Sequence, residues 1–142
     1  MAAYSERTVF NQGMNERITI DPFYGREIIK INNLDATVAR EGDTYEILAQ
    51  SLEMEAWELY RFNDHAAGYR PQANEVVYLE PKNRKPARNH EYHTAGVGET
   101  MHFISQVYGI KLKPLYRRNR MDPGEQPTVG EVIYLRKKRP VN

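Results

Sequence analysis

Residues 39–45 read Ala-Arg-Glu-Gly-Asp-Thr-Tyr, and residues 95–101 read Ala-Gly-Val-Gly-Glu-Thr-Met. Laying Gly42 on Gly98, an offset of 56 residues (98 − 42), aligns residues 39–82 with residues 95–138 without a gap. Identical residues recur along the whole alignment: Ala39/Ala95, Gly42/Gly98, Thr44/Thr100, Gln50/Gln106, Leu59/Leu115, Tyr60/Tyr116, Arg61/Arg117, Asn63/Asn119, Gly68/Gly124, Pro71/Pro127, Glu75/Glu131, Val76/Val132, Tyr78/Tyr134, Leu79/Leu135 and Lys82/Lys138. Such a period indicates a tandem array of one small folding unit, and an array favours binding over a single catalytic centre.

The pattern within each repeat predicts a strand, two helices and a closing strand. In the first repeat we expect strands at residues 37–40 and 75–79, with Thr44 as the N-cap of one helix and residues 56–62 as the next helix. In the second repeat the corresponding strands are predicted at 92–97 and 131–135 and the helices at 100–108 and 112–118.

Three positions are expected to shape the turns between these elements. Asn63 suits a left-handed stop after the second helix. Asn74 and Gly130 occupy equivalent places before the closing strands, and both residue types tolerate a positive φ. We therefore predict a left-handed backbone position at this point of each repeat.

Outside the repeats, the sequence divides into an extension, a linker and a tail. Residues 1–15 are expected to be poorly ordered, and residues 17–20 and 26–31 to form a hairpin-like element around the Pro and Gly of 21–25. The predicted divisions are an extension with a β-hairpin (1–35), the first repeat (36–82), a basic proline-containing solvated linker (83–91), the second repeat (92–138) and a tail (139–142). The fold class expected is α+β.

Composition narrows the possible partners. The chain of 142 residues has no cysteine, so disulfides and thiolate metal sites are excluded. Its 20 basic and 19 acidic residues give a formal net charge of +1, which offers no bulk attraction for nucleic acid or anionic lipid and favours a neutral ligand. No apolar run is long enough for a membrane span, and residues 1–7 lack the apolar core of a signal peptide.

Three features recur in both repeats. These are the turns Gly-Asp-Thr at 42–44 and Gly-Glu-Thr at 98–100, the pairs Leu59…Asn63 and Leu115…Asn119, and the closing Pro-x-x-[Asn/Gly]-Glu-Val-[Val/Ile]-Tyr-Leu. Together they resemble the LysM domain family. The resemblance covers both repeats. More narrowly, Tyr-Leu-x-Pro-Lys, Tyr-Gly-Ile-Lys-Leu at 108–112 and Asn-Arg-Met at 119–121 look like the C-terminal region of Bacteroidetes-type cell-wall glucosaminidases. The resemblance implies two βααβ modules in tandem.

The LysM resemblance also implies a shallow groove that recognises N-acetylglucosamine-containing glycans such as peptidoglycan. The groove lies between the loop after the first strand and the loop before the last, where exposed backbone pairs with the sugar amide and an apolar niche holds its methyl group. Tyr45, Met101, Met121 or Tyr69 would supply that niche. The implied ligand residues are Gly42, Asp43, Thr44, Tyr45, Asn63, Asp64 and His65 in the first repeat and Gly98, Glu99, Thr100, Met101, Asn119, Arg120 and Met121 in the second.

One feature departs from the family pattern. The second helix is usually followed by Asn-Pro and an aliphatic residue, whereas this chain has Asn-Asp-His-Ala at 63–66 and Asn-Arg-Met-Asp at 119–122. We therefore expect the second repeat, which keeps Met121, to bind sugar better than the first. The Gly-[Asp/Glu]-Thr turns also have a purely structural interpretation, as a turn and a helix cap.

The remaining motifs favour packing or solvation over chemistry. Residues 90–93, His-Glu-Tyr-His, lack the spacing of a zinc-binding His-Glu-x-x-His helix, so no metal site is expected. Glu53, Glu55 and Glu58 are predicted to form a solvated helix face, and Trp57, which aligns with Lys113, to pack. Tyr60, Tyr78 and their counterparts are predicted core residues. The basic runs at 84–88 and 136–139 are typical of solvated segments, with contact to anionic wall polymers or nucleic acid as the alternative.

These observations predict a non-catalytic chain without cofactor that binds peptidoglycan in the cell envelope, periplasmic or secreted, and anchors an attached or partner cell-wall hydrolase. Two weak modules joined by a linker would gain residence on a repetitive polymer by avidity. The alternative is a structural adaptor that uses LysM-like modules for protein–protein assembly in phage-tail-like or envelope machinery. An enzyme with its site in residues 1–35 is disfavoured, because that stretch has no histidine or cysteine.

Overall fold

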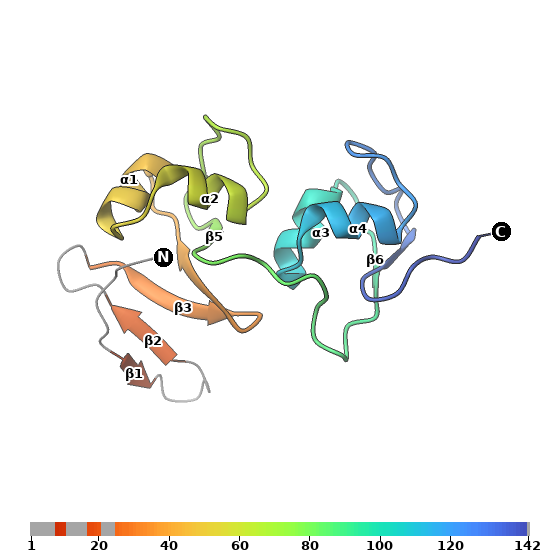
Figure 1. Cartoon of the computed structure of the whole chain (residues 1–142), viewed down its shortest axis with the longest axis horizontal. Coiled ribbons are helices and arrows are strands. Elements are labelled where there is room, and N and C mark those ends of the chain that lie inside the picture. Colours follow the sequence, from red (N-terminus) through yellow and green to blue (C-terminus); the bar gives the residue numbers. More distant parts are fainter. Residues whose placement is uncertain (1–7, 11–16, 21–24, 142) are drawn as a thin grey trace. The chain divides into compact units, whose positions relative to one another are not determined.

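The computed structural model describes residues 8–10, 17–20 and 25–141, and it divides the chain into two compact units (Figure 1). Unit 1 is Met1–Pro81 and unit 2 is Lys82–Asn142.

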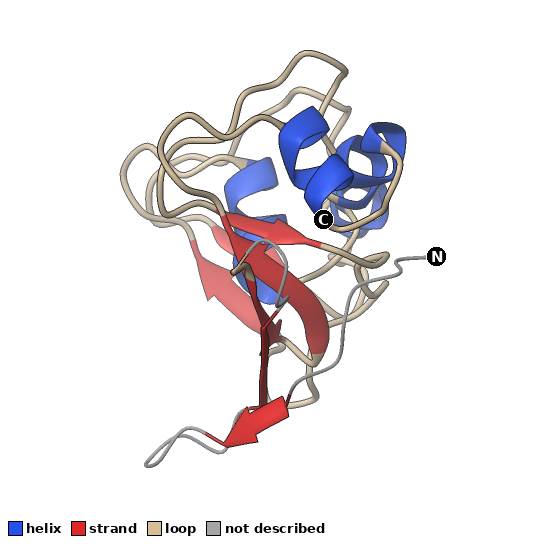
Figure 2. Cartoon of the chain, turned by 90° about the vertical axis from the view of Figure 1, so that its left-hand side faces the viewer, coloured by secondary structure: helices blue, strands red, loops and turns tan. Residues whose placement is uncertain are grey.

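Unit 1 is built on a five-stranded antiparallel sheet whose strand order follows the chain (Figure 2). Its strands are β1 (Thr8–Phe10), β2 (Arg17–Ile20), β3 (Glu27–Ile31), β4 (Leu34–Val38) and β5 (Val76–Tyr78). The pairing of β2 with β3, with Ile20 opposite Glu27, confirms the predicted hairpin. Asn32 and Asn33, with φ of 53° and 63°, then reverse the chain tightly into β4, as Asn can in a two-residue hairpin turn.

Two helices complete unit 1 (Figure 1). Helix α1 (Tyr45–Ser51) begins after the Thr44 cap, and α2 (Ala56–Phe62) begins with a capping box between Glu55 and Glu58. Their apolar faces pack on the sheet around one buried cluster: Ile28, Ala39, Tyr45, Leu48, Ala49, Leu52, Met54, Leu59, Tyr60, Val77 and Leu79. The helices are too short to be stable alone, so this burial holds them in place.

Unit 2 repeats the strand–helix–helix–strand order with a two-stranded sheet. Strands β6 (Tyr92–Thr94) and β7 (Val132–Tyr134) pair antiparallel, and helices α3 (Met101–Tyr108) and α4 (Leu112–Arg118) lie between them in the chain. Gly109 ends α3 with φ of 64°, a left-handed C-cap that glycine adopts without steric cost. The core is the cluster Ala95, Met101, Ile104, Ile110, Leu115, Tyr116, Ile133 and Leu135.

The described helices and sheets are compatible with the predicted α+β class. The bounds predicted for α2 and α4 are confirmed to the residue, whereas the closing strands β5 and β7 are shorter at both ends than predicted. Tyr60 (8% exposed), Tyr116 (6%) and Tyr78 (0%) are core residues as predicted, and Tyr134 is half-buried. Trp57 is 58% exposed, so its predicted packing is at most partial.

The predicted extension was wrong in two respects. Residues 8–10 of the lead-in form β1, while the rest of residues 1–15 lies outside the described residues. In addition, β3 pairs with β4, so residues 27–35 belong to the same sheet as the first repeat. The Asn32–Asn33 turn that joins β3 to β4 is a local hairpin signal, and the predicted boundary at residue 35 falls within β4.

The predicted solvated linker also packs on unit 2 in part. Lys82, which was predicted to end the first repeat, belongs to unit 2: it is buried, and its Nζ donates to Ser105 Oγ at 3.2 Å and Gln106 Oε1 at 2.6 Å. The N–H of Asn83 donates to the carbonyl of Gly109 at 2.9 Å, and Pro86 is buried. The first residues of the linker are therefore part of the second unit.

Candidate functional site

The loop after β4 in unit 1 is locked by a buried ion pair. Asp43 receives both terminal nitrogens of Arg26, each at 2.7 Å, and also the backbone N–H of Arg40 at 2.7 Å. Burial would raise the pKa of Asp43, but the hydrogen bonds from Arg26 and Arg40 outweigh it and hold that pKa below its ordinary value. The carboxylate is 7% exposed, so it stabilises the loop from its buried side.

The equivalent loop of unit 2 uses different partners for the same position. Glu99 Oε1 accepts the backbone N–H of Gly96 at 2.8 Å and lies 2.7 Å from His93 Nε2. His93 Nδ1 lies in turn 2.8 Å from the hydroxyl of Tyr108. The hydrogen bonds from Gly96 and His93 lower the pKa of Glu99. A chain of three side chains thus fixes this loop against α3.

The other residues of the two turns have backbone roles. Thr44 Oγ1 accepts the N–H of Ile47 and Thr100 Oγ1 that of Phe103, both at 3.0 Å, so both predicted N-caps are confirmed. Gly42 (φ 85°) precedes the first cap, and Gly98 occupies the same place with φ of 74°. A Cβ on either glycine would meet nothing within 4 Å, so the turns are open to their surroundings and the glycine requirement lies in the backbone angle.

Asn63 and Asn119 tie the end of the second helix to the closing strand. Asn63 Nδ2 donates to the carbonyls of Leu59 (2.8 Å) and Tyr78 (2.9 Å), and its Oδ1 accepts the N–H of Tyr78 at 2.8 Å. Asn119 makes the same three bonds one repeat later, at 2.9, 2.9 and 2.7 Å. Both side chains are buried, at 0% and 3% exposure, so any glycan contact predicted for them is not made by an exposed amide.

The left-handed stop after the second helix is shifted from its predicted position. Asn63 has φ of −103°, and the next residue, Asp64, carries the positive φ of 54°. Arg120 has the same φ in unit 2 and is exposed, with Nε donating to the carbonyl of Arg139 at 2.8 Å. The shift follows from the buried bonds of Asn63, which hold its backbone at the last helical turn.

The predicted apolar niche divides between core and surface. Tyr45 and Met101 are fully buried, and burial raises the pKa of Tyr45, whose hydroxyl has no hydrogen-bond partner among the described residues. Contact through residues 45 and 101 is therefore limited to their backbone in this conformation. Met121 is half-buried against the unit 2 core.

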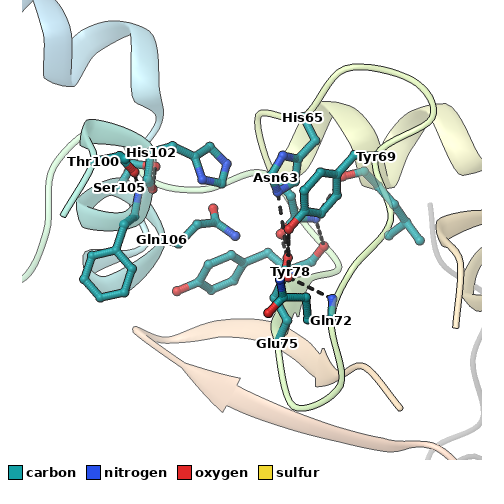
Figure 3. A network of polar contacts seen from close by, with 12 residues as sticks. Asn63, His65, Tyr69, Gln72, Glu75, Tyr78, Thr100, His102, Ser105 and Gln106 are labelled. Carbon is teal, nitrogen blue, oxygen red and sulfur yellow. Dashed lines mark hydrogen bonds and ion pairs between the residues drawn. The ribbon is translucent and has the colours of Figure 1, made fainter. Parts of the chain in front are cut away.

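His65 takes part in an aromatic cluster at the loop before β5. Its ring stacks on Tyr69, with ring centres 3.4 Å apart and planes at 7° (Figure 3). The Tyr69 hydroxyl donates to the carboxylate of Glu75 at 2.7 Å, and burial together with this hydrogen bond raises the pKa of Tyr69 to about 12. Glu75 also accepts the N–H of Gln72 at 3.0 Å. These contacts stabilise the conformation of the loop in the absence of a ligand.

The two loops of each repeat meet at one hydrogen-bonded pair. The N–H of Ala39 donates to the carbonyl of Glu75, and its carbonyl accepts the N–H of Asn74, both at 2.8 Å. Ala95 makes the same two bonds at the same lengths in unit 2. Asn74 has φ of 71° and Gly130 of 85°, which confirms the predicted left-handed position.

In unit 1 a cleft of about 470 Å³ opens beside this junction. It is lined by Gly25, Arg26, Glu27, Thr37, Val38, Ala39, Arg40, Glu41, Ala73 and Asn74. The cleft thus lies between the loop after β4 and the loop before β5, with residues 25–27, at the start of β3, as an additional wall. None of the fourteen residues implied by the resemblance lines it.

Some of the lining had a signal in the sequence. Ala39 is identical to Ala95, and the left-handed pair of Asn74 with Gly130 marks the turn beside it. Arg26 had none, because its contact with Asp43 joins segments 17 residues apart. The wall from β3 could not be read from the repeat.

Within residues 25–141, no group of three or more histidine, aspartate or glutamate side chains is placed to hold a metal ion. No helix of the described part of the chain is both long and apolar enough to cross a membrane.

Comparison with known proteins gives a distant structural likeness. No family model matches the chain, and no curated protein matches it. The spore cortex-lytic enzyme SleL of Bacillus cereus aligns with 73% of the chain at 19% identity, with a TM-score of 0.31. SleL of Bacillus megaterium QM B1551 aligns with 72% at 17% identity and the same TM-score. The chain spans less than a quarter of the length of each, 23% and 22%, and a TM-score this low does not establish a shared fold.

Proposed function

We propose that units 1 and 2 are tandem LysM-type modules that bind N-acetylglucosamine-containing glycan, with peptidoglycan as the polymer. The observation that carries the proposal is the repetition of one loop framework. Both units have the strand–helix–helix–strand order, the same capped turn, the same asparagine tie and the same hydrogen-bonded junction. Frameworks that fix two loops beside each other are common positions for ligand sites.

The cleft of unit 1 has the mixed lining that an N-acetyl sugar requires. Val38 and Ala73 offer apolar surface for a methyl group or a sugar face, while Arg40, Glu41 and Asn74 bring hydrogen-bonding groups. The volume of about 470 Å³ lies within the range of roughly 300–1,000 Å³ typical of small-ligand pockets. Since the near-zero net charge gives no long-range pull on a charged polymer, short-range contacts of this kind suit a neutral glycan.

The chain then acts as an anchor rather than a catalyst. Two modules on one chain raise the local concentration of the second site once the first is bound, so weak single sites give durable attachment to a repeating polymer. An attached or partner hydrolase would be retained on its substrate in the cell envelope, either in the periplasm or outside the cell. No cofactor is required for this activity.

Sedimentation of the full chain with purified insoluble peptidoglycan tests the proposal. Ala73 lines the cleft and is exposed, so Ala73→Trp fills it without removing a hydrogen bond. Val129, 66% exposed, is its counterpart in unit 2. Ala67→Trp, in the same loop of unit 1 but outside the cleft lining, is the matched control.

We expect the wild type and Ala67→Trp to sediment, Ala73→Trp to sediment less, and the double variant Ala73→Trp/Val129→Trp to remain in solution. Circular dichroism checks that each variant is folded. A wild type that stays in the supernatant, or a double variant that sediments as the wild type does, would overturn glycan binding through these loops.

The structural adaptor is the second candidate, and one observation favours it. Unit 2 exposes several large apolar side chains, among them Val97 (87% exposed) and Phe103 (47%). Large apolar side chains that are exposed in this way can be buried against a protein partner. This function predicts no sedimentation with peptidoglycan and a defined complex with one protein of the assembly, weakened by Phe103→Ser.

A further inference from the structure

Unit 2 carries a small cleft walled almost entirely by cations. The cleft has a volume of about 170 Å³ and is lined by Arg84, Pro114, Arg117, Arg118 and Lys138. We call it the basic cleft. Its residues come from the start of unit 2, from α4 and from the segment after β7, so the fold and not one basic run assembles it.

No carboxylate of the described chain forms an ion pair with these cations. Arg118 Nη1 instead donates to the carbonyl of Leu135 at 3.0 Å, and the neighbouring Arg136 donates to the carbonyl of Pro86. Burial and the adjacent charges of Arg84, Arg136 and Arg117 lower the pKa of Arg118. The fold thus keeps several positive charges close together, although they repel one another.

The other repeat shows that the fold does not require this charge. Pro114, Arg118 and Arg136 correspond, at the offset of 56, to Glu58, Phe62 and Glu80. Two positive charges and a proline are thereby replaced by two acids and an aromatic ring on the same framework of helices and strands. Arg117 and Lys138 of the lining have identical counterparts in Arg61 and Lys82. The charges that unit 2 adds are therefore Arg84 and Arg118 in the lining and Arg136 beside it, and these need an explanation other than folding.

We infer that the basic cleft binds a phosphate group of an anionic ligand, as a second site distinct from the glycan loops. Guanidinium groups present paired donors that match phosphate oxygens, and several of them together suit a multiply charged oxyanion. The volume of the cleft accommodates one such group. No aromatic ring lines the cleft, so it has no stacking surface for a nucleobase, which favours phosphate without a base.

Titration of the full chain with inorganic phosphate at low ionic strength, followed by amide chemical shifts, tests the inference. The cleft variant replaces three exposed lining residues: Arg84→Gln, Arg117→Gln and Lys138→Gln. The control replaces three exposed cations of the same unit outside the lining: Arg88→Gln, Lys111→Gln and Lys137→Gln. Both variants lose three positive charges, so bulk charge affects them equally.

We expect saturable shifts around α4 in the wild type, at least tenfold weaker phosphate binding in the cleft variant, and an affinity within about twofold of wild type in the control. Equal weakening in both variants would mean diffuse charge attraction and would overturn the site. Shifts that do not saturate in the wild type would do the same.

A second arm tests whether the cleft recognises anything besides the phosphate group. Poly(glycerol phosphate) and a single-stranded oligonucleotide with the same number of phosphates are compared as competitors. If the phosphate group alone is recognised, both displace inorganic phosphate with similar strength. Displacement by the oligonucleotide only would overturn the inference. Because glycan sedimentation uses other residues, its failure leaves this result unaffected, and the reverse also holds.

Discussion

The two units place a carboxylate at the same point of the fold and give it different partners. Asp43 is paired with Arg26 of the segment before β3, outside the repeat, whereas Glu99 is paired with His93 of its own first strand. The difference in length is accommodated at Gly96, where a Cβ would lie 3.3 Å from the Glu99 carboxyl carbon. Unit 1 therefore depends on its extension for a buried charge, while unit 2 is complete without one.

The largest effect is expected from breaking this dependence. Arg26→Met leaves Asp43 buried without its cation, which costs about 3 kcal/mol. Amide hydrogen exchange of the full chain, resolved by unit, should show a large loss of protection in unit 1 and none in unit 2. His93→Gln should have a much smaller effect, because Glu99 is partly exposed and keeps the N–H of Gly96.

The double variant Arg26→Met/Asp43→Asn is the control for this prediction. It removes the buried charge together with its partner and should regain part of the lost protection. Unchanged protection in Arg26→Met, or an equal loss in both units, would show that the extension does not support unit 1 in this way.

Removing the hydrogen bonds of Asn63 or Asn119 should, by contrast, destabilise the two units to a similar extent. Asn63→Ala and Asn119→Ala each remove three side-chain hydrogen bonds and leave backbone groups of the closing strand unsatisfied, which costs about 2 kcal/mol. Each variant should lower protection in its own unit. Asn74→Gly, which installs the residue of the second repeat at an exposed turn, should change stability by less than about 0.5 kcal/mol.

The helix caps offer a milder form of the same comparison. Thr44→Ala and Thr100→Ala should each destabilise their unit by about 1 kcal/mol, because each removes the acceptor for one N–H of the first turn. Thermal unfolding of the full chain measures the loss, and Thr→Ser at either position should restore most of it. A serine variant as unstable as the alanine variant would contradict capping as the cause.

The smallest effect is expected from pH. Asp43 and Glu99 have pKa values lowered from 3.8 and 4.5, so the unfolded chain takes up protons first as pH falls. The stability that each carboxylate contributes is complete above its unfolded pKa and is lost as pH falls through the lowered folded pKa. Unit 2 should therefore begin to lose protection at a higher pH than unit 1.

Exchange measured in steps from about pH 6 to pH 3 checks this order. Asp43→Asn should remove the dependence in unit 1 only, and Glu99→Gln that in unit 2 only. Parallel loss in the two units, unaffected by either substitution, would assign the acid sensitivity to other groups.

The sequence by itself determined the features that depend on near neighbours in the chain. The threonine caps, the bounds of α2 and α4, the glycine turns and the left-handed positions at Asn74 and Gly130 were all predicted. Each rests on the φ of one residue or on a hydrogen bond within a few residues, and the repetition showed each pattern twice.

Only the tertiary structure decided which surfaces meet. The pairing of β4 with β5, the hydrogen bonds of Arg26 to Asp43, the burial of Tyr45 and Met101 and the packing of Lys82 on α3 all depend on contacts between segments that no local pattern connects. The cleft of unit 1 and the basic cleft of unit 2 arise in the same way. Backbone pairing and core burial bring together residues that are close in space but distant in the sequence.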